Sequence, residues 1–127
     1  MKNILLVDDD QISVFLISKA LELSGKAGNI LTASNCEQAL TLFKNDHRRS
    51  TFLPDVIFLD LNMPGMDGFG FLSAFADLAF EGKDKIRIIV LSSSINIEDF
   101  RRAKALGASG HLSKPLTIDQ ARDALAL

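Results

Sequence analysis

The residues best suited to chemistry stand where apolar runs end. Asp8, Asp9 and Asp10 follow directly on the run Ile4–Val7, and Asp60 closes a second run. Adjacent carboxylates repel one another, so such a group either stays solvated or holds a cation. An all-oxygen group without His or Cys suits a hard divalent cation such as Mg²⁺ better than zinc. We therefore expect a magnesium site if the fold brings Asp8, Asp9 and Asp60 together. Asp10 is expected to be solvated or to start a helix.

The elements that must position these residues alternate along the chain. Five strand candidates have the sequences NILLV, NILTA, DVIFL, IRIIVL and SGHLS, and apolar residues at three- and four-residue steps follow each of them. Asn35, Asn96 and Thr117 are N-cap candidates, and Gly107 is expected to close the fourth helix in left-handed geometry. This alternation predicts an α/β fold with a parallel sheet covered on both faces. We expect a flavodoxin-like, doubly wound (βα)5 arrangement with strand order 2-1-3-4-5.

The first helical segment carries more apolar surface than one face needs. Its main apolar stripe consists of Ile12, Phe15, Leu16, Ala20 and Leu23. Val14, Ile17 and Leu21 lie off that stripe. We expect the additional surface to be buried between the sheet and a neighbouring helix, with a dimer interface as the alternative.

The expected sheet places the polar strand ends in one site. The carboxyl ends of parallel strands share one edge, and ligands bind there at the switch point between the first and third strands. Asp8, Asp9 and Asp60 would meet at that point, with Ser92 and Lys114 on the far side of Asp60. A metal ion and an ammonium group on either side of Asp60 would make it a candidate nucleophile for phosphoryl transfer. Ser92 could donate a hydrogen bond to a phosphoryl oxygen.

Composition restricts the class of protein. A chain of 127 residues with 47% hydrophobic content predicts one domain over residues 1–127. A net charge of -2 excludes the basic footprint of a direct nucleic-acid binder, although Arg101, Arg102 and Lys104 could face a protein partner. The single cysteine, Cys36, is expected to be a packed side chain. No signal peptide or membrane-spanning stretch is evident, so we expect a soluble, cytoplasmic protein without a membrane partner.

Four motifs together resemble a known family. LLVDDD, VIFLDLNMPGMDG, IIVLSSS and GASGHLSKPL occur in the order and spacing of the receiver domain of two-component response regulators, the family of the single-domain chemotaxis receiver. The resemblance covers essentially the whole chain. It implies that Asp60 accepts a phosphoryl group, with Mg²⁺, from a histidine kinase or a phosphotransfer protein. It also implies a switch and not an enzyme, with only weak self-phosphorylation from small acyl phosphates and slow autodephosphorylation.

The resemblance also implies the ligands of the metal. Asp9 matches the direct metal ligand of the family, and Asp8 matches the acid that contributes largely through water. Asp60 itself faces the metal. The backbone carbonyl of Asn62 completes the site, which agrees with its place in the tight loop after Asp60.

Further residues are implied to bind the phosphoryl group and to transmit its presence. Lys114 matches the lysine that pairs with the phosphoryl group, and the bond from Lys114 to Pro115 matches the family's cis peptide. Ser92 occupies the position of the switch hydroxyl. His111 stands where many receivers carry Tyr or Phe, so a phosphorylation-dependent change of its rotamer is a hypothesis. A partly exposed strand histidine without a switching role is the alternative.

The implied output is a change of protein partner. A downstream target would bind the face formed by the fourth helix, fifth strand and fifth helix, and the protein would be a monomer or a phosphorylation-dependent dimer. An aspartyl-phosphate phosphatase is disfavoured, because its general acid would stand where this chain has Asn62. A constitutive, phosphorylation-independent binding module is the main alternative, but the chain retains all the acids and the lysine of the motif.

Overall fold

The computed structural model describes residues 1–44, 53–63, 65–93 and 96–126. Its centre is a parallel sheet of five strands in the order β2-β1-β3-β4-β5. The strands are β1 (Lys2–Val7), β2 (Ala27–Ala33), β3 (Val56–Asp60), β4 (Arg87–Ser92) and β5 (Gly110–Ser113). Strand pairing and order confirm the predicted flavodoxin-like fold.

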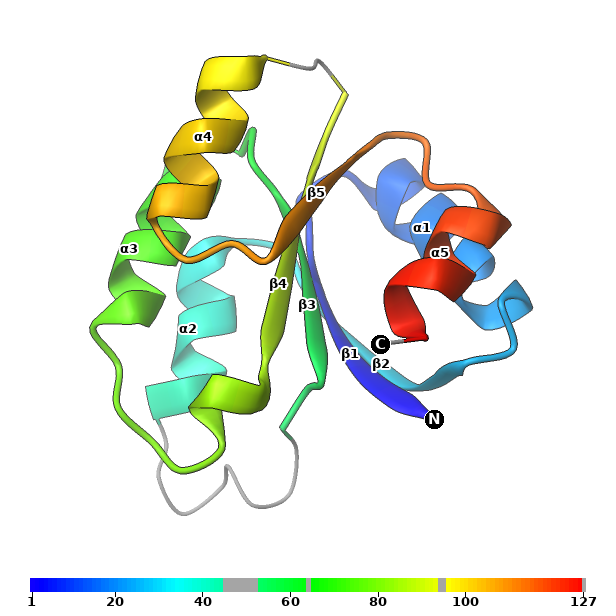
Figure 1. The fold of residues 1–127 in the computed structure, drawn as a ribbon, viewed down its shortest axis with the longest axis horizontal. Coiled ribbons are helices and arrows are strands. Elements are labelled where there is room, and N and C mark those ends of the chain that lie inside the picture. The colour runs from blue at the N-terminus through cyan, green and yellow to red at the C-terminus, as the bar shows by residue number, and fades with distance from the viewer. Residues whose placement is uncertain (45–52, 64, 94–95, 127) are drawn as a thin grey trace.

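Within the described residues, five α-helices cover the sheet as two layers. They are α1 (Gln11–Leu23), α2 (Cys36–Lys44), α3 (Gly68–Ala76), α4 (Ile97–Ala105) and α5 (Ile118–Leu125), and a short 3-10 helix spans Lys83–Lys85. Figure 1 shows α2, α3 and α4 on one face of the sheet and α1 and α5 on the other. All five helices follow strands, so their N-termini lie at the carboxyl edge of the sheet, where the predicted site residues stand.

The core consists of two apolar clusters separated by the sheet. Alternate strand residues face opposite sides, so Leu5 and Val7 pack against α2 and α3 while Ile4 and Leu6 pack against α1 and α5. Every residue of β3 is buried, as expected for a central strand covered on both faces. The continuous apolar sequence of β3 therefore reflects two buried faces rather than one.

The face of helix α1 that is buried is not the one that carries its main apolar stripe. Ile17 and Leu21 are buried in the cluster shared with α5, which confirms the expected burial of the additional surface. Most of the stripe itself faces solvent, with side chains between 53 and 71% exposed at Ile12, Phe15, Leu16 and Leu23. Both faces of α1 are apolar, and the sheet covers the face that carries Ile17, Ala20 and Leu21.

The predicted helix ends are confirmed. The side chains of Asp10, Asn96 and Thr117 accept hydrogen bonds from the first turns of α1, α4 and α5, and Thr117 forms a reciprocal capping box with Gln120. Gly107 follows α4 with a φ of 112°, the left-handed conformation that favours glycine. Asp10 is thus a helix-starting residue, as predicted.

No helix among the described residues is long and apolar enough to cross a membrane.

Candidate functional site

Strand pairing brings the acidic residues together. Val7 on β1 lies opposite Leu59 on β3, so the residues that follow, Asp8 and Asp60, reach the same edge side by side. β3 and β4 pair Asp60 with Leu91, which places Ser92 one residue beyond. The parallel sheet thus brings residues that lie far apart in sequence together at its carboxyl edge, as predicted from the topology.

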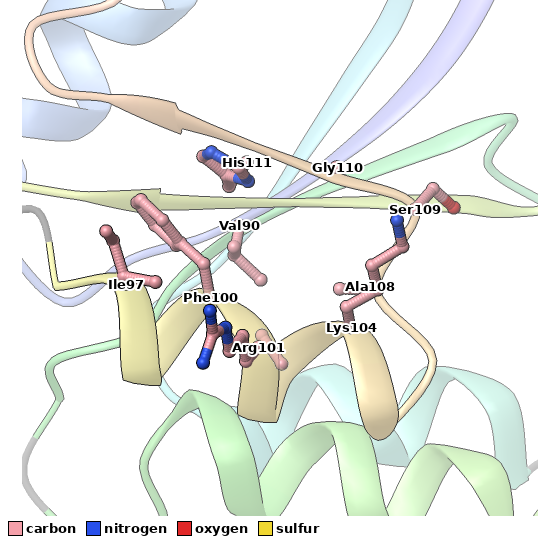
Figure 2. A pocket seen from close by; sticks show the side chains of 10 residues that line it. Val90, Ile97, Phe100, Arg101, Lys104, Ala108, Ser109, Gly110 and His111 are labelled. Atoms are coloured by element: carbon pink, nitrogen blue, oxygen red, sulfur yellow. The ribbon is translucent and has the colours of Figure 1, made fainter.

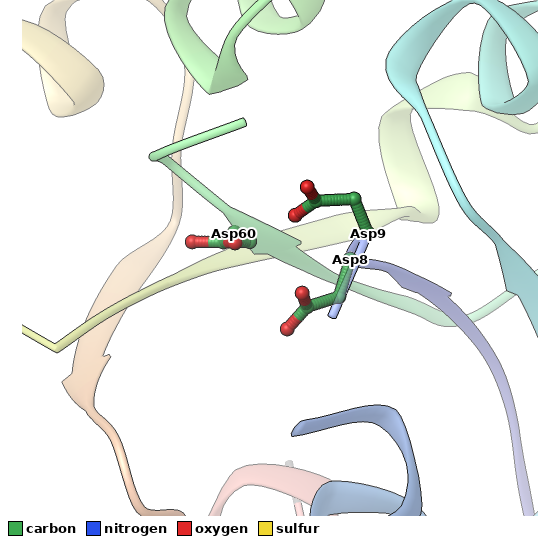
Figure 3. Close-up of side chains that lie close together, drawn as sticks. All are labelled: Asp8, Asp9 and Asp60. Carbon is green, nitrogen blue, oxygen red and sulfur yellow. The ribbon is translucent and has the colours of Figure 1, made fainter. Parts of the chain in front are cut away.

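Three carboxylates surround one space at the ends of β1 and β3 (Figure 3). One carboxylate oxygen from each of Asp8, Asp9 and Asp60 lies within 4.8 Å of the other two. Asp8 and Asp60 are buried, with 1 and 6% of their surfaces exposed, whereas Asp9 is open to solvent. The cluster therefore has a buried wall and an accessible side.

Lys114 is the counter-charge of the two buried acids. Its Nζ lies 2.8 Å from Asp8 Oδ2 and 3.5 Å from Asp60 Oδ2. The same ammonium group donates to the Ser13 hydroxyl at 3.4 Å, in the first turn of α1. Lys114 therefore joins the end of β5 to β1 and α1. The Lys114–Pro115 peptide bond is cis.

Backbone amides hold one oxygen of each buried carboxylate. The Asp10 N–H donates to Asp8 Oδ1 at 2.9 Å, and the Asn62 N–H donates to Asp60 Oδ1 at 3.1 Å. Each contact spans two residues, the local pattern in which an Asp side chain orders the turn that follows it. The other oxygen of each group, Oδ2, faces Lys114.

Burial and the neighbouring charges together shift the pKa values of Asp60 and Lys114. Burial raises the pKa of Asp60 above that of an ordinary aspartate, and Asp8 adds to this, while the Asn62 N–H and Lys114 act against it. Burial alone would lower the pKa of Lys114, but its hydrogen bond to Asp8 and the charge of Asp60 raise it overall. Lys114 therefore stays positively charged, and it lies beside Asp60, whose negative charge is unfavourable because the carboxylate is buried.

Ser92 lies on the other side of Asp60. The hydroxyl is buried and accepts a hydrogen bond from Asn62 Nδ2 at 3.4 Å. Asn62 therefore contacts both sides of the site, through its backbone N–H to Asp60 and its side chain to Ser92.

The chemistry of the donors fits a hard divalent cation. Asp8, Asp9 and Asp60 offer oxygen only, and the exposed side of the cluster leaves room for water ligands. A cation held there would face Asp60 from the side opposite Ser92. Asn62 follows Asp60 closely enough for its backbone carbonyl to be a candidate fourth ligand.

The first residue of α3, Gly68, is packed tightly against the end of β3. A Cβ atom at Gly68 would lie 2.8 Å from Leu61 Cα and 2.9 Å from the carbonyl oxygen of Asp60. Asp67 caps α3 by accepting from the Gly70 N–H at 2.9 Å. Gly68 therefore lets the start of α3 approach the residue that carries the central carboxylate.

Two residues at the site were missed by the sequence analysis. Ser13 was not singled out, although its place in the first turn after Asp10 was a usable signal. Gly68 was not distinguished from the neighbouring glycines, because close approach of two backbones has no local signature. Cys36, by contrast, is a packed side chain as predicted. Burial, and to a smaller extent the nearby carboxylates, raises the pKa of its thiol to about 12.

His111 lies outside this cluster of side chains. It is exposed on β5, and its ring stacks on that of Phe100 from α4, with centroids 3.6 Å apart and an interplanar angle of 17°. The inward position that a switching ring would take next to Ser92 is not the position seen here.

Comparison with known proteins places the chain among signalling domains. The sequence profile of the response regulator receiver domain matches residues 4–126. The chain is 30% identical over 126 residues to sporulation initiation phosphotransferase F of Bacillus subtilis, covering 98% of this chain and 92% of that protein. It is 32% identical over 123 residues to the probable chemotaxis protein CheY of Rhizobium etli, covering 97 and 88%.

Solved structures agree with this similarity. The chemotaxis protein CheY4 of Vibrio cholerae superposes with a TM-score of 0.79 at 28% identity, over 98% of this chain and 96% of that one. A two-component response regulator from Cytophaga hutchinsonii superposes with a TM-score of 0.85 at 26% identity, over 97 and 95%. The aligned parts span nearly the whole of each chain, so the similarity is one of the whole fold.

Proposed function

Because the chain belongs to the response regulator receiver family of two-component signalling, we propose that it is a switch in which Asp60 accepts a phosphoryl group from a histidine kinase or a phosphotransfer protein. Receivers of this family are phosphoacceptor switches rather than conventional enzymes. The observation that carries the assignment of Asp60 is that its buried carboxylate belongs to the cluster with Asp8 and Asp9 and also lies 3.5 Å from the Lys114 ammonium group. The profile match over residues 4–126 supports one receiver unit over residues 1–127.

Each side chain of the site has a separate role in the transfer of the phosphoryl group. One carboxylate oxygen of Asp60 bonds to phosphorus as the bond from phosphorus to the donor's imidazole nitrogen breaks, and the imidazole takes the electron pair. Asn62 keeps Asp60 oriented through its N–H, which donates to Oδ1. Lys114 can move from Asp8 to a phosphoryl oxygen, because its Nζ already lies 3.5 Å from Asp60 Oδ2. Mg²⁺, held by Asp8, Asp9, Asp60 and the Asn62 carbonyl, would supply the remaining positive charge.

Phosphorylation would be transmitted through the two polar groups beyond Asp60. Ser92, which now accepts a hydrogen bond from the Asn62 side chain, would release it and donate a hydrogen bond from its hydroxyl to a phosphoryl oxygen. His111 would then leave its stack on Phe100 and turn towards the space near Ser92. The face formed by α4, β5 and α5 would change with it and bind a downstream protein, either as a monomer or as a phosphorylation-dependent dimer. Small acyl phosphates would also serve as donors, with slow autodephosphorylation afterwards.

The experiment that tests Asp60 as the acceptor is intact-mass measurement after incubation with acetyl phosphate, with and without Mg²⁺. We expect one phosphoryl adduct that requires both Mg²⁺ and Asp60, and none in the Asp60→Asn variant. Asp84→Asn, which removes an exposed carboxylate from the 3-10 helix, is the matched control and should form the adduct normally. Absence of any adduct, with Mg²⁺ binding intact, would favour a constitutive binding module and remove Asp60 as nucleophile.

A further inference from the structure

The ammonium group of Lys114 is largely enclosed and needs a partner for each of its three hydrogens. Only 15% of the Lys114 side chain is exposed, and a buried charge is costly unless it is hydrogen-bonded. Asp8 Oδ2 lies 2.8 Å and Asp60 Oδ2 3.5 Å from Nζ, so the two buried acids supply two of the partners. The hydroxyl of Ser13, at 3.4 Å, is a third partner and carries no charge.

The N-cap of α1 determines where the Ser13 hydroxyl points. Ser13 Oγ donates to Asp10 Oδ2 at 3.2 Å, while the other oxygen of Asp10 accepts from the Ile12 N–H at 3.0 Å. Because the one hydroxyl hydrogen is directed to Asp10, the lone pairs of Oγ are left to accept from Lys114. Ser13 is therefore an oriented acceptor for an ammonium group that lies 101 residues away in sequence.

Four hydrogen bonds close a ring at this side of the site. Lys114 donates to Asp8 and to Ser13, and Ser13 donates to Asp10. The Asp10 N–H donates to the second oxygen of Asp8 at 2.9 Å and completes the ring. The ring joins the ends of β1 and β5 to the first turn of α1, and it holds Ser13 in place without any contact between Ser13 and Asp60 in the ring itself.

Transfer of a phosphoryl group would change both charged partners of Lys114. Asp60 would become an acyl phosphate, and Lys114 would leave Asp8 for a phosphoryl oxygen. A cation at the acidic cluster would also draw on the Asp8 carboxylate. Ser13 lies outside that cluster and its hydroxyl is neutral, so it is the contact that Lys114 can keep while the other two change.

We infer that Ser13 is a positioning residue of the phosphoryl-transfer site, whose hydroxyl holds the Lys114 ammonium group beside Asp60 while Lys114 exchanges Asp8 for a phosphoryl oxygen. The inference rests on the proposed function, because it assigns a further residue to that reaction. Without the hydroxyl, one ammonium hydrogen turns to water and Lys114 is held by the acids alone. The positive charge is then less often in place for the phosphoryl oxygens, and transfer is slower.

The first test measures Lys114 directly in the metal-free protein. Proton–nitrogen NMR of the full chain detects the ammonium group, and loss of the signal in Lys114→Arg assigns it. We expect its hydrogens to exchange with water roughly threefold faster or more in Ser13→Ala, because one hydrogen bond to a charged group is lost. Ser13→Thr keeps a hydroxyl at this position and should stay within about twofold of the native rate.

The second test measures the reaction. Intact mass follows adduct formation at Asp60 from acetyl phosphate, at one fixed concentration of Mg²⁺ for all variants. We expect Ser13→Ala to form the adduct roughly threefold more slowly or less. Ser13→Thr should form it at a rate within about twofold of the native protein, which a loss of helix packing alone would not predict.

Two controls separate this role from general effects on the fold. Ser18→Ala removes a hydroxyl from the same helix and should leave both rates within about twofold of native. Lys104 is the reference lysine: it is exposed and lines a hollow of about 570 Å³ between α4 and β5, whose lining includes neither Lys114 nor its partners (Figure 2). Its ammonium hydrogens should exchange equally fast in all variants. Amide spectra show whether each variant is folded.

Four results would overturn the inference: unchanged exchange at Lys114 in Ser13→Ala, an unchanged rate of adduct formation, equal effects of Ser18→Ala, or a Ser13→Thr variant that behaves like Ser13→Ala. If the native protein forms no adduct at Asp60, the proposed function fails, and the exchange measurement still decides whether Ser13 holds Lys114. Adduct formation at the same rate in the native protein and in Ser13→Ala contradicts this inference alone.

Discussion

At the level of single residues, Asp60 is held at a cost to the fold. Burial and the neighbouring Asp8 raise its pKa, so the folded protein binds the Asp60 proton more tightly than the unfolded chain does. Between the unfolded and the raised pKa, the folded state therefore holds more protons, and stability falls as the pH rises through this window. At neutral pH the ionised Asp60 carboxylate therefore destabilises the folded state, because it is buried in the site.

We predict that Asp60→Asn is more stable than the native protein at neutral pH, by about 1 kcal/mol, the usual gain when a strained functional group is neutralised. The difference should shrink as the pH falls below the raised pKa, because native Asp60 is then protonated. Urea unfolding followed by circular dichroism measures both, since the chain has no Trp or Tyr for fluorescence. The exposed Asp84→Asn change should stay within about 0.5 kcal/mol of the native protein. Lower stability of Asp60→Asn at neutral pH would contradict the assignment of this cost.

A metal ion bound at the acidic cluster would compete with Lys114 for the same carboxylates. The ammonium group lies 2.8 Å from Asp8, closer than its 3.5 Å from Asp60, so it neutralises an acid that the metal would also use. We predict that Lys114→Met binds Mg²⁺ more tightly, roughly tenfold or 1.4 kcal/mol, and accepts phosphate from acetyl phosphate more slowly. Calorimetry measures the first effect and intact mass the second. Lys19→Met, a cation removed from the other end of α1, should change neither, and weaker Mg²⁺ binding by Lys114→Met would refute the competition.

At the level of elements, the junction of β3 and α3 determines how close the helix comes to the site. Gly68 lies against the backbone of Asp60 and Leu61, at distances that a methyl group cannot occupy without a shift of the main chain. The position of the Asp60 carboxylate therefore depends on Gly68, a residue eight positions further along the chain that has no side chain of its own in the site.

We predict that Gly68→Ala lowers the free energy of unfolding by about 1–3 kcal/mol, the cost of forcing an extra group into a packed site. It should also slow adduct formation at Asp60, because the loop must move away from the carboxyl edge. Gly110→Ala is the matched control, since nothing lies within 4 Å of a Cβ built there, and it should be close to neutral. Similar losses of stability in the two variants would show that close approach at Gly68 is not the cause.

At the level of the whole molecule, the acidic cluster would link cation binding to folding. The three carboxylates converge only when β1 and β3 pair, so the unfolded chain has no comparable site. Any cation that binds the folded form selectively must stabilise it by mass action.

We predict that Mg²⁺ at about 100 times its dissociation constant raises the free energy of unfolding by about 2.7 kcal/mol. Asp9→Asn should remove most of that gain while leaving metal-free stability nearly unchanged, because Asp9 is exposed. Thermal unfolding with and without Mg²⁺, at constant ionic strength, measures the difference. An equal gain from the same ionic strength of sodium chloride would indicate screening of the acids instead of a specific site.

The sequence by itself determined the fold and the set of acids at the site. Strand–helix alternation indicated a doubly wound parallel sheet, and in such a sheet the ends of all strands share one edge. The convergence of Asp8, Asp9 and Asp60 therefore followed from topology, without knowledge of any distance. Helix ends were equally predictable, because a cap such as Thr117 depends on residues only three positions apart.

Only the tertiary structure decided which apolar face of α1 is buried, which acid Lys114 contacts more closely, and which residue of α1 reaches Lys114. Ile12 and Ile17 are alike in hydrophobicity, so periodicity cannot choose between the faces that carry them, and packing against the sheet and α5 makes the choice. The contact of Lys114 with Asp8 spans 106 residues. Such features depend on how separate elements pack in three dimensions, and local sequence patterns do not contain that information.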